Sequence, residues 1–212
     1  MSLDLVKAIK APFSGQDWIK KLIIGGILFI IPIVNFAMVG YVIKYLKNIL
    51  NGNESTPEIS DFGALFVTGI KAFVGSLLLF IPFGIICFII GMLFSDAQIV
   101  ANLIVYVFYI VYYFVAYILM ARFAMDEKIL SMVDFASAGK LLAGNKNTLL
   151  FVLFLIALGI VYGVVTTVCC ITVVGMILIP FIILASMLSN FNLIGQFVKN
   201  SPNFEEVKAS AN

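Results

Sequence analysis

Histidine is absent from this chain of 212 residues, and charged residues make up only 11% of it. General acid–base catalysis needs a titratable group in a shielded site, and histidine is the side chain that most often supplies it. Carboxylates do not replace it, because no Asp or Glu lies inside the long apolar intervals of the sequence. The adjacent pairs Asp126-Glu127 and Glu205-Glu206 are interpreted as solvated charges outside those intervals. We therefore expect no catalytic residue and a protein that is not an enzyme.

Cysteine is also scarce, with only Cys87, Cys169 and Cys170, all in apolar stretches. Two adjacent cysteines make a poor disulfide pair and an incomplete metal site, so we interpret all three as buried free thiols. The sequence has no GxxxxGK[ST] phosphate loop and no basic cluster interleaved with aromatic residues, the pattern typical of nucleic-acid binding. We expect no metal, no cofactor and no nucleic-acid partner.

Apolar residues are abundant, at 63% of the chain, whereas an average soluble domain carries about 25% charged residues. Uncharged intervals cover residues 22–43, 72–95, 97–121 and 147–198. A helix needs about 20 apolar residues to cross a bilayer, so the last interval holds two crossings. We expect an all-α polytopic membrane protein with four full transmembrane helices in two hairpins, over residues 72–95, 97–121, 147–170 and 174–198.

The basic residues predict how these hairpins are oriented. The hairpin tips, at Asp96 and at CCITVVG (169–175), contain no Lys or Arg. Because cytoplasmic loops carry the excess of Lys and Arg, the tips are expected outside and the connecting loops inside. We expect a multi-pass protein of the cytoplasmic membrane with a cytoplasmic N-terminus and a cytoplasmic tail over residues 199–212.

The first apolar interval, 22–43, allows two interpretations. As one helix it would be about 33 Å long, enough for one crossing, and proline is tolerated in membrane helices. Alternatively, Pro32 breaks the helix, Asn35 satisfies the freed backbone groups, and residues 22–50 form a broken or re-entrant segment. We favour the break, because it leaves all 13 Lys and Arg residues on one side.

Three amphipathic stretches, residues 1–20, 57–70 and 129–143, are expected to lie along the membrane interface. Thr56 and Pro57 predict the start of the second stretch, as an N-cap followed by proline at the first helical position. The three stretches are interpreted either as connectors that cover the bundle or as a surface that docks a partner or senses membrane curvature.

A short pattern recurs in which proline follows glycine by seven residues, in GGILFIIP (25–32) and GSLLLFIP (75–82). A third Ile-Pro pair ends at Pro180. This repeat is either a trace of duplication, as in many transporters, or a coincidence in an apolar chain. The candidate helix breaks or packing points are Gly25, Gly26, Pro32, Asn35, Pro82 and Pro180.

Polar side chains within the long helices supply the remaining candidates. Tyrosines recur at helical spacing in YVFYIVYYFVAY (106–117), and SNFNLIGQ (189–196) adds amides near the end of the last helix. These groups either bond to neighbouring helices or line a site for a lipid headgroup or small polar solute. The candidate lining residues are Tyr106, Tyr109, Tyr113, Tyr117, Asn190 and Asn192.

Glycines, prolines and aromatic residues in the first third of the chain follow a family pattern. They include Pro12-Phe13, Trp18-Ile19-Lys20-Lys21, Gly25-Gly26, Ile31-Pro32-Ile33, Gly40-Tyr41, Pro57, Asp61-Phe62 and Gly69. Over about residues 12–75 the sequence resembles an uncharacterised prokaryotic membrane family, domain of unknown function 4013. This resemblance implies a small polytopic protein of a prokaryotic cytoplasmic membrane and no particular activity.

Our leading functional hypothesis is a non-catalytic membrane component that acts by helix packing with itself, with lipid or with another membrane protein. Gly159 and Gly163 form a GxxxG pattern, which permits close helix contacts. The alternative is a transporter or channel for a small uncharged or weakly polar solute. Ion-coupled carriers usually have ionisable groups within the membrane, and the apolar intervals contain none.

Overall fold

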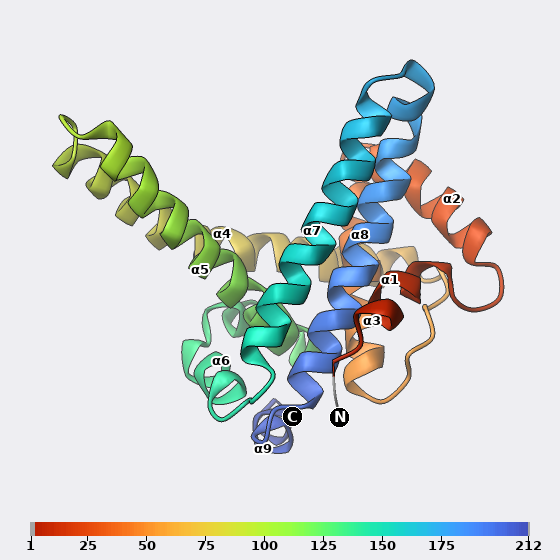
Figure 1. Ribbon diagram of the computed structural model, residues 1–212. Helices are drawn as coiled ribbons and strands as arrows, with labels where there is room; N and C mark the ends of the chain where they lie inside the picture. Colours follow the sequence, from red (N-terminus) through yellow and green to blue (C-terminus); the bar gives the residue numbers. More distant parts are fainter. Residues whose placement is uncertain (1–2, 212) are drawn as a thin grey trace.

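The computed structural model describes residues 3–211, with the side chain of Val174 excepted, and every regular element in this range is helical. Two long hairpins dominate it, α4 (Phe62–Leu93) with α5 (Gln98–Asp126) and α7 (Thr148–Cys170) with α8 (Val173–Lys199). Figure 1 shows that the two hairpins diverge from a common base, where the described ends of the chain and the short helix α9 (Phe204–Ala209) also lie. The predicted all-α fold with two hairpins is confirmed.

The long helices turn most of their apolar side chains outward. All four are long and apolar enough to cross a membrane, and only 11% of the most apolar window of α4, α5 and α7 is buried within the protein. The corresponding value for α8, which lies at the centre of the fold, is 50%. Such extensive apolar surface requires a lipid environment, so this is a multi-pass membrane protein.

The first apolar interval is broken where Pro32 predicts a break. Helix α2 (Trp18–Ile30) stops two residues before the proline, and α3 (Asn35–Leu50) begins three residues after it. Figure 1 shows α2 rising beside α8 and α3 returning toward the base. At about 1.5 Å per residue, α2 is about 20 Å long and too short to cross a bilayer.

The hydrogen bonds at this break are not the ones expected from the Asn35 side chain. The backbone bridges the break itself, because the amide of Asn35 donates to the carbonyl of Ile31 and the amide of Phe36 donates to that of Ile33. Ile33 has a φ of 72°, which is strained for a β-branched residue. The side-chain Oδ1 of Asn35 is buried without a hydrogen-bond partner among the described residues. The prediction that it caps the broken backbone is therefore wrong.

Helix α3 forms the centre of the packed base. It crosses α4 with backbone against backbone at Gly40 and Gly69. A Cβ added to Gly40 would lie 1.9 Å from the carbonyl oxygen of Leu65, and one added to Gly69 would lie 1.8 Å from that of Phe36. Only glycine allows two helices to approach so closely.

Several predicted boundaries are wrong. Residues 57–70 and 72–95 do not form an interfacial helix and a separate span, because α4 is one helix of 32 residues with Asp61 as its N-cap. The only feature between the two predicted pieces is Lys71, and a single lysine does not end a helix. Pro82 and Pro180 lie inside continuous helices and break neither of them, as is tolerated in membrane helices.

The other two interfacial stretches are also subdivided. The first contains α1 (Leu5–Lys10) and the 3₁₀ helix η1 (Ala11–Phe13), and its end already belongs to α2. The third contains the 3₁₀ helix η2 (Ile129–Val133) and α6 (Phe135–Leu142). Asp134 separates these two pieces because its carboxylate caps α6. The thiols are free, but they are not buried as expected, since Cys170 is exposed and the other two are partly exposed.

Candidate functional site

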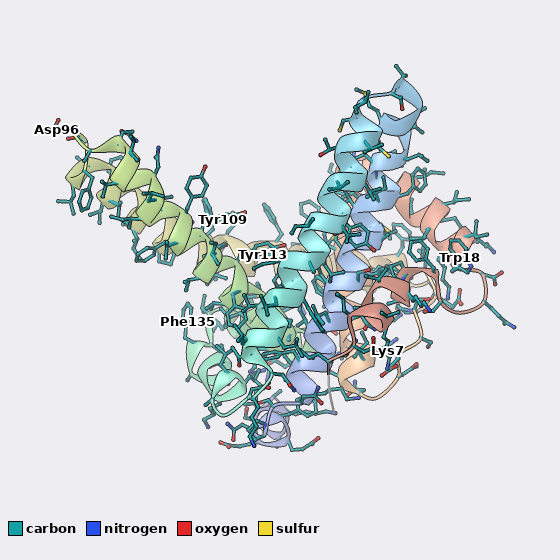
Figure 2. The ribbon with its side chains drawn as sticks, viewed as in Figure 1. Lys7, Trp18, Asp96, Tyr109, Tyr113 and Phe135 are labelled. Carbon is teal, nitrogen blue, oxygen red and sulfur yellow. The ribbon has the colours of Figure 1, made fainter. Side chains whose placement is uncertain are left out.

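The predicted tyrosine row borders a cleft between the two hairpins. Tyr109 and Tyr113 lie on the side of α5 that faces α7 (Figure 2). With Gly159 and apolar side chains of α5 and α7, they line a cleft of about 360 Å³. The helices meet below it, where the rings of Phe114 and Phe151 lie 5.6 Å apart. The cleft is therefore open toward the hairpin tips and almost entirely apolar.

The other tyrosines of the row have different surroundings. The hydroxyls of Tyr113 and Tyr117 lie 2.5 Å apart and bond to each other, and the Tyr117 ring packs edge-on against Phe191 of α8. Tyr106 is 68% exposed, nearer the hairpin tip. The row is thus divided between an open cleft, an exposed tip and the packed interior.

The two predicted asparagines of α8 do not reach the cleft. Asn190 donates a hydrogen bond to the carbonyl of Ser186 in its own helix. Asn192 is buried near the base and donates to the hydroxyl of Tyr45 on α3, with a nitrogen–oxygen distance of 2.9 Å. The predicted site residues therefore do not form a single site.

The predicted packing points of the first segment are brought together with α8. A Cβ added to Gly25 would lie 2.5 Å from Cδ2 of Leu184, and one added to Gly26 would lie 2.3 Å from the ring of Phe181. These glycines let α2 lie flat against α8 just after Pro180. Gly25 and Gly26 therefore lie where α2 approaches α8 most closely.

A cluster of buried charges at the base was not predicted. Arg122 of α5, only 6% exposed, pairs with Asp126 at 2.9 Å and with Asp134 at 3.1 Å. The Asp126 side chain is 2% exposed and also accepts a hydrogen bond from Ser131. The interpretation of Asp126 as a solvated charge is therefore wrong. The spacing Arg122–Asp126, one helical turn, was the available signal in the sequence.

Glu127 joins three helices beside this cluster. It has a φ of 55° at the end of α5, accepts from Lys47 of α3 at 2.6 Å and accepts from Thr68 of α4 at 2.9 Å. Burial would raise the pKa of Glu127, but the hydrogen bonds from Lys47 and Thr68 outweigh burial and hold its pKa below the usual value. The same balance, with hydrogen bonds from Ser137 and Arg122, lowers the pKa of Asp134. Both carboxylates are therefore charged at neutral pH. Their hydrogen bonds link neighbouring helices at the base.

The cleft and the charge cluster differ in their chemistry. Within residues 3–211, no three His, Cys, Asp or Glu side chains are grouped so that they could hold a metal ion. The cleft offers apolar surface and the hydroxyls of Tyr109 and Tyr113, whereas the charge cluster consists of one ion pair within α5 and one from α5 to the N-cap of α6.

One comparison with known proteins is informative. A family described as "Protein of unknown function (DUF4013)" matches residues 24–171. The match begins later than the resemblance over residues 12–75 and extends through both helices of the first hairpin and all of α7. Among curated proteins and among solved structures, nothing matches this chain. Because the family match covers more than half of the sequence, the chain belongs to the DUF4013 family.

Proposed function

We propose that this protein is a non-catalytic membrane component that associates, through the open side of its hairpins, with a second copy of itself. The observation that carries the proposal is the divergence of the hairpins (Figure 1), which leaves the cleft between α5 and α7 without a covering element. In a bilayer, such a cleft is filled either by lipid chains or by another helix. A helix with a small-residue surface fits better, and this chain provides one.

The small-residue surface lies on α7, the helix that borders the cleft. A Cβ added to Gly159 or Gly163 would meet no atom within 4 Å outside the local backbone. At Gly40 and Gly69, by contrast, an added Cβ would collide with the backbone of another helix. The GxxxG pair of α7 is thus unused within the described chain and available for a close contact with another helix.

Transport remains the second candidate, but the cavities support it less. Midplane substrate sites are built where broken helices expose backbone and polar groups. The cleft lining contains Tyr109 and Tyr113 but not Asn35, which lies beside the only break in the first segment. We therefore favour association over solute passage.

We place the protein in a prokaryotic cytoplasmic membrane, as the family resemblance implies, and the charge distribution supports a base that lies in the cytoplasm. The base carries the ion pairs Arg122–Asp126, Lys47–Glu127 and Lys140–Glu206. The tips near Asp96 and Ile171 carry no basic residue. The positive-inside tendency then places both tips outside the cell and α1 inside.

The association is tested by introducing a bulky side chain at the open glycine. Gly159→Ile is expected to weaken self-association in liposomes by roughly tenfold, equivalent to about 1.4 kcal/mol, because the branched side chain keeps the partner helix away. Energy transfer between labelled copies, measured as lipid dilutes the protein, reports the dissociation constant. Gly91→Ile on α4 is the matched control, because Gly91 is equally open but lies outside the cleft lining. A wild-type chain that stays monomeric at every density would contradict the proposal, as would equal effects of the two substitutions.

The orientation is tested by labelling single cysteines in a background that lacks Cys87, Cys169 and Cys170. A cysteine at Gln98, at one tip, is expected to react with an impermeant maleimide added to intact cells. Cysteines at Gln16 and Asn53, which flank the broken α2–α3 segment, are expected to react only after permeabilisation. A Gln16 cysteine that reacts in intact cells would mean that the first segment crosses the membrane once.

A further inference from the structure

Two adjoining cavities at the base lie among α1, α3, α8 and the loop after α3. Their volumes are about 430 Å³ and about 220 Å³, and Asp4, Lys7 and Glu54 line both. Figure 2 shows Lys7 on α1 at the base of the molecule, away from the cleft between the hairpins. Tyr45 and Asn192 form the inner wall of the larger cavity, although they are only 0% and 2% exposed. The proposed self-association does not use this region.

Behind this wall, four residues form a series of hydrogen bonds in which each residue donates to the next. The series starts at a backbone amide, and this amide fixes which group donates at every later step. The amide of Asp4 can only donate, and it donates to Oε1 of Gln196 at 2.8 Å. Nε2 of Gln196 then donates to Oδ1 of Asn192 at 2.7 Å, and Nδ2 of Asn192 donates to the hydroxyl oxygen of Tyr45 at 2.9 Å. Since an amide oxygen accepts and an amide nitrogen donates, each orientation follows from the one before it.

The last member of this series is a hydroxyl whose hydrogen is uncommitted. Tyr45 accepts from Asn192, and its own O–H has no acceptor among the described residues. Burial raises the pKa of Tyr45 to about 12, so the hydroxyl keeps its hydrogen at neutral pH. A buried donor without a partner is unfavourable, and rotation about the C–O bond can direct this one into the cavity. The cavity therefore offers a donor that a ligand can use.

The two carboxylates that line the cavities, in contrast, are each engaged with Lys7. Oδ1 of Asp4 accepts from the amide of Lys7 at 2.9 Å, and Oε2 of Glu54 pairs with Nζ of Lys7 at 2.5 Å. Two further cations line the cavities, Lys10 in the larger and Lys199 in the smaller. Neither of them has an ion-pair partner within residues 3–211. Beside these two engaged carboxylates, the lining offers the Tyr45 hydroxyl and two ammonium groups as donors.

We infer that the paired cavities at the base form a binding site for a phosphate group, with the Tyr45 hydroxyl and the Lys10 ammonium group of the larger cavity as its donors and Lys199 in the smaller cavity as a further positive charge. Phosphate is rich in acceptor oxygens and carries the negative charge that two free lysines favour. It is presented either by a lipid headgroup at the membrane surface or by a soluble phosphate compound. Helix α1 would cover the bound group. Asp4, the N-cap of α1, holds the helix in this position because its backbone is hydrogen-bonded to the Gln196 side chain.

The test measures the melting temperature of the full chain in a phosphate-free maltoside detergent. Inorganic phosphate is titrated at constant ionic strength in one arm, and the lipid arm compares nanodiscs of phosphatidylglycerol with nanodiscs of phosphatidylcholine. We expect ligand-dependent stabilisation of the wild type. Tyr45→Phe and Lys10→Gln are each expected to raise the apparent dissociation constant about tenfold, because each removes one hydrogen bond to a charged ligand.

Tyr41→Phe is the matched control, since Tyr41 lies one turn earlier on α3, is 1% exposed and does not line the cavity. Lys20→Gln controls for the loss of one positive charge outside the site. Stabilisation by inorganic phosphate would assign the site to soluble phosphate compounds, and stabilisation by phosphatidylglycerol alone would assign it to a lipid headgroup. The inference is overturned if neither probe stabilises the wild type, or if Tyr45→Phe and Tyr41→Phe respond alike.

Discussion

Replacing Gly69 with alanine is expected to prevent α3 and α4 from packing and to leave little folded protein. The added Cβ would lie 1.8 Å from the carbonyl oxygen of Phe36, which is backbone and cannot rotate away. Overpacking of side chains typically costs about 1–3 kcal/mol, and we expect this collision between backbones to cost at least about 3 kcal/mol. The measurement is the fraction of monodisperse protein in mild detergent, followed by the free energy of unfolding of the remaining folded fraction.

Gly63→Ala provides the control for Gly69→Ala on the same helix. An added Cβ at Gly63 would meet no atom within 4 Å, so this variant tests only the change in helix propensity. Alanine is favoured over glycine in helices by about 1 kcal/mol, so we expect no loss of stability. If Gly69→Ala proves as stable as Gly63→Ala, α3 and α4 do not cross at Gly69.

Replacing Arg122 with methionine is expected to destabilise the base by about 3–5 kcal/mol, the usual cost of removing one partner of a buried ion pair. Methionine keeps much of the apolar stem of arginine but leaves Asp126, 2% exposed, without its nearest positive charge. Asp134, on the far side of η2, loses the bond that holds it to α5. The unfolding free energy in detergent reports the loss, and proteolysis of the segment between α5 and α7 reports the local release.

Lys128→Met is the matched control for this cluster. Lys128 is 3.9 Å from the same Asp126 carboxylate, but its side chain is 65% exposed, so we expect a change of at most about 1 kcal/mol. Adding Asp126→Asn to Arg122→Met should recover part of the stability, because it removes the buried unpaired charge. If Arg122→Met and Lys128→Met are equally mild, Asp126 is not buried in an ion pair with Arg122.

Much of the fold could be predicted because it depends on neighbours along the chain. The long uncharged intervals predict the two hairpins, since the bilayer sets the length of an apolar helix. Pro32 predicts the break between α2 and α3, because the lost amide and the ring act within one turn. The boundary at Asp61 was missed because Thr56-Pro57 is an equally good local start signal, and the structure leaves residues 57–61 outside the helix.

Much less of the candidate site could be predicted. The spacing of Tyr109 and Tyr113 correctly placed them on one face of a helix, but the cleft beside them exists only because two hairpins diverge. The bond between Tyr45 and Asn192 joins residues separated by 147 positions. Nothing local to either residue indicates the other.

The sequence by itself determined the class of this protein and its four spans and favoured the break in its first segment, because hydropathy and proline chemistry act over a few residues. The tertiary structure alone decided that α3 crosses α4 at Gly40 and Gly69, that Arg122 pairs with the buried Asp126 and with Asp134, and that a hydrogen-bonded series ends at the Tyr45 hydroxyl. Close backbone contact, charge burial and donor direction depend on which segments meet in space. These contacts between distant segments result from the packing of the whole chain.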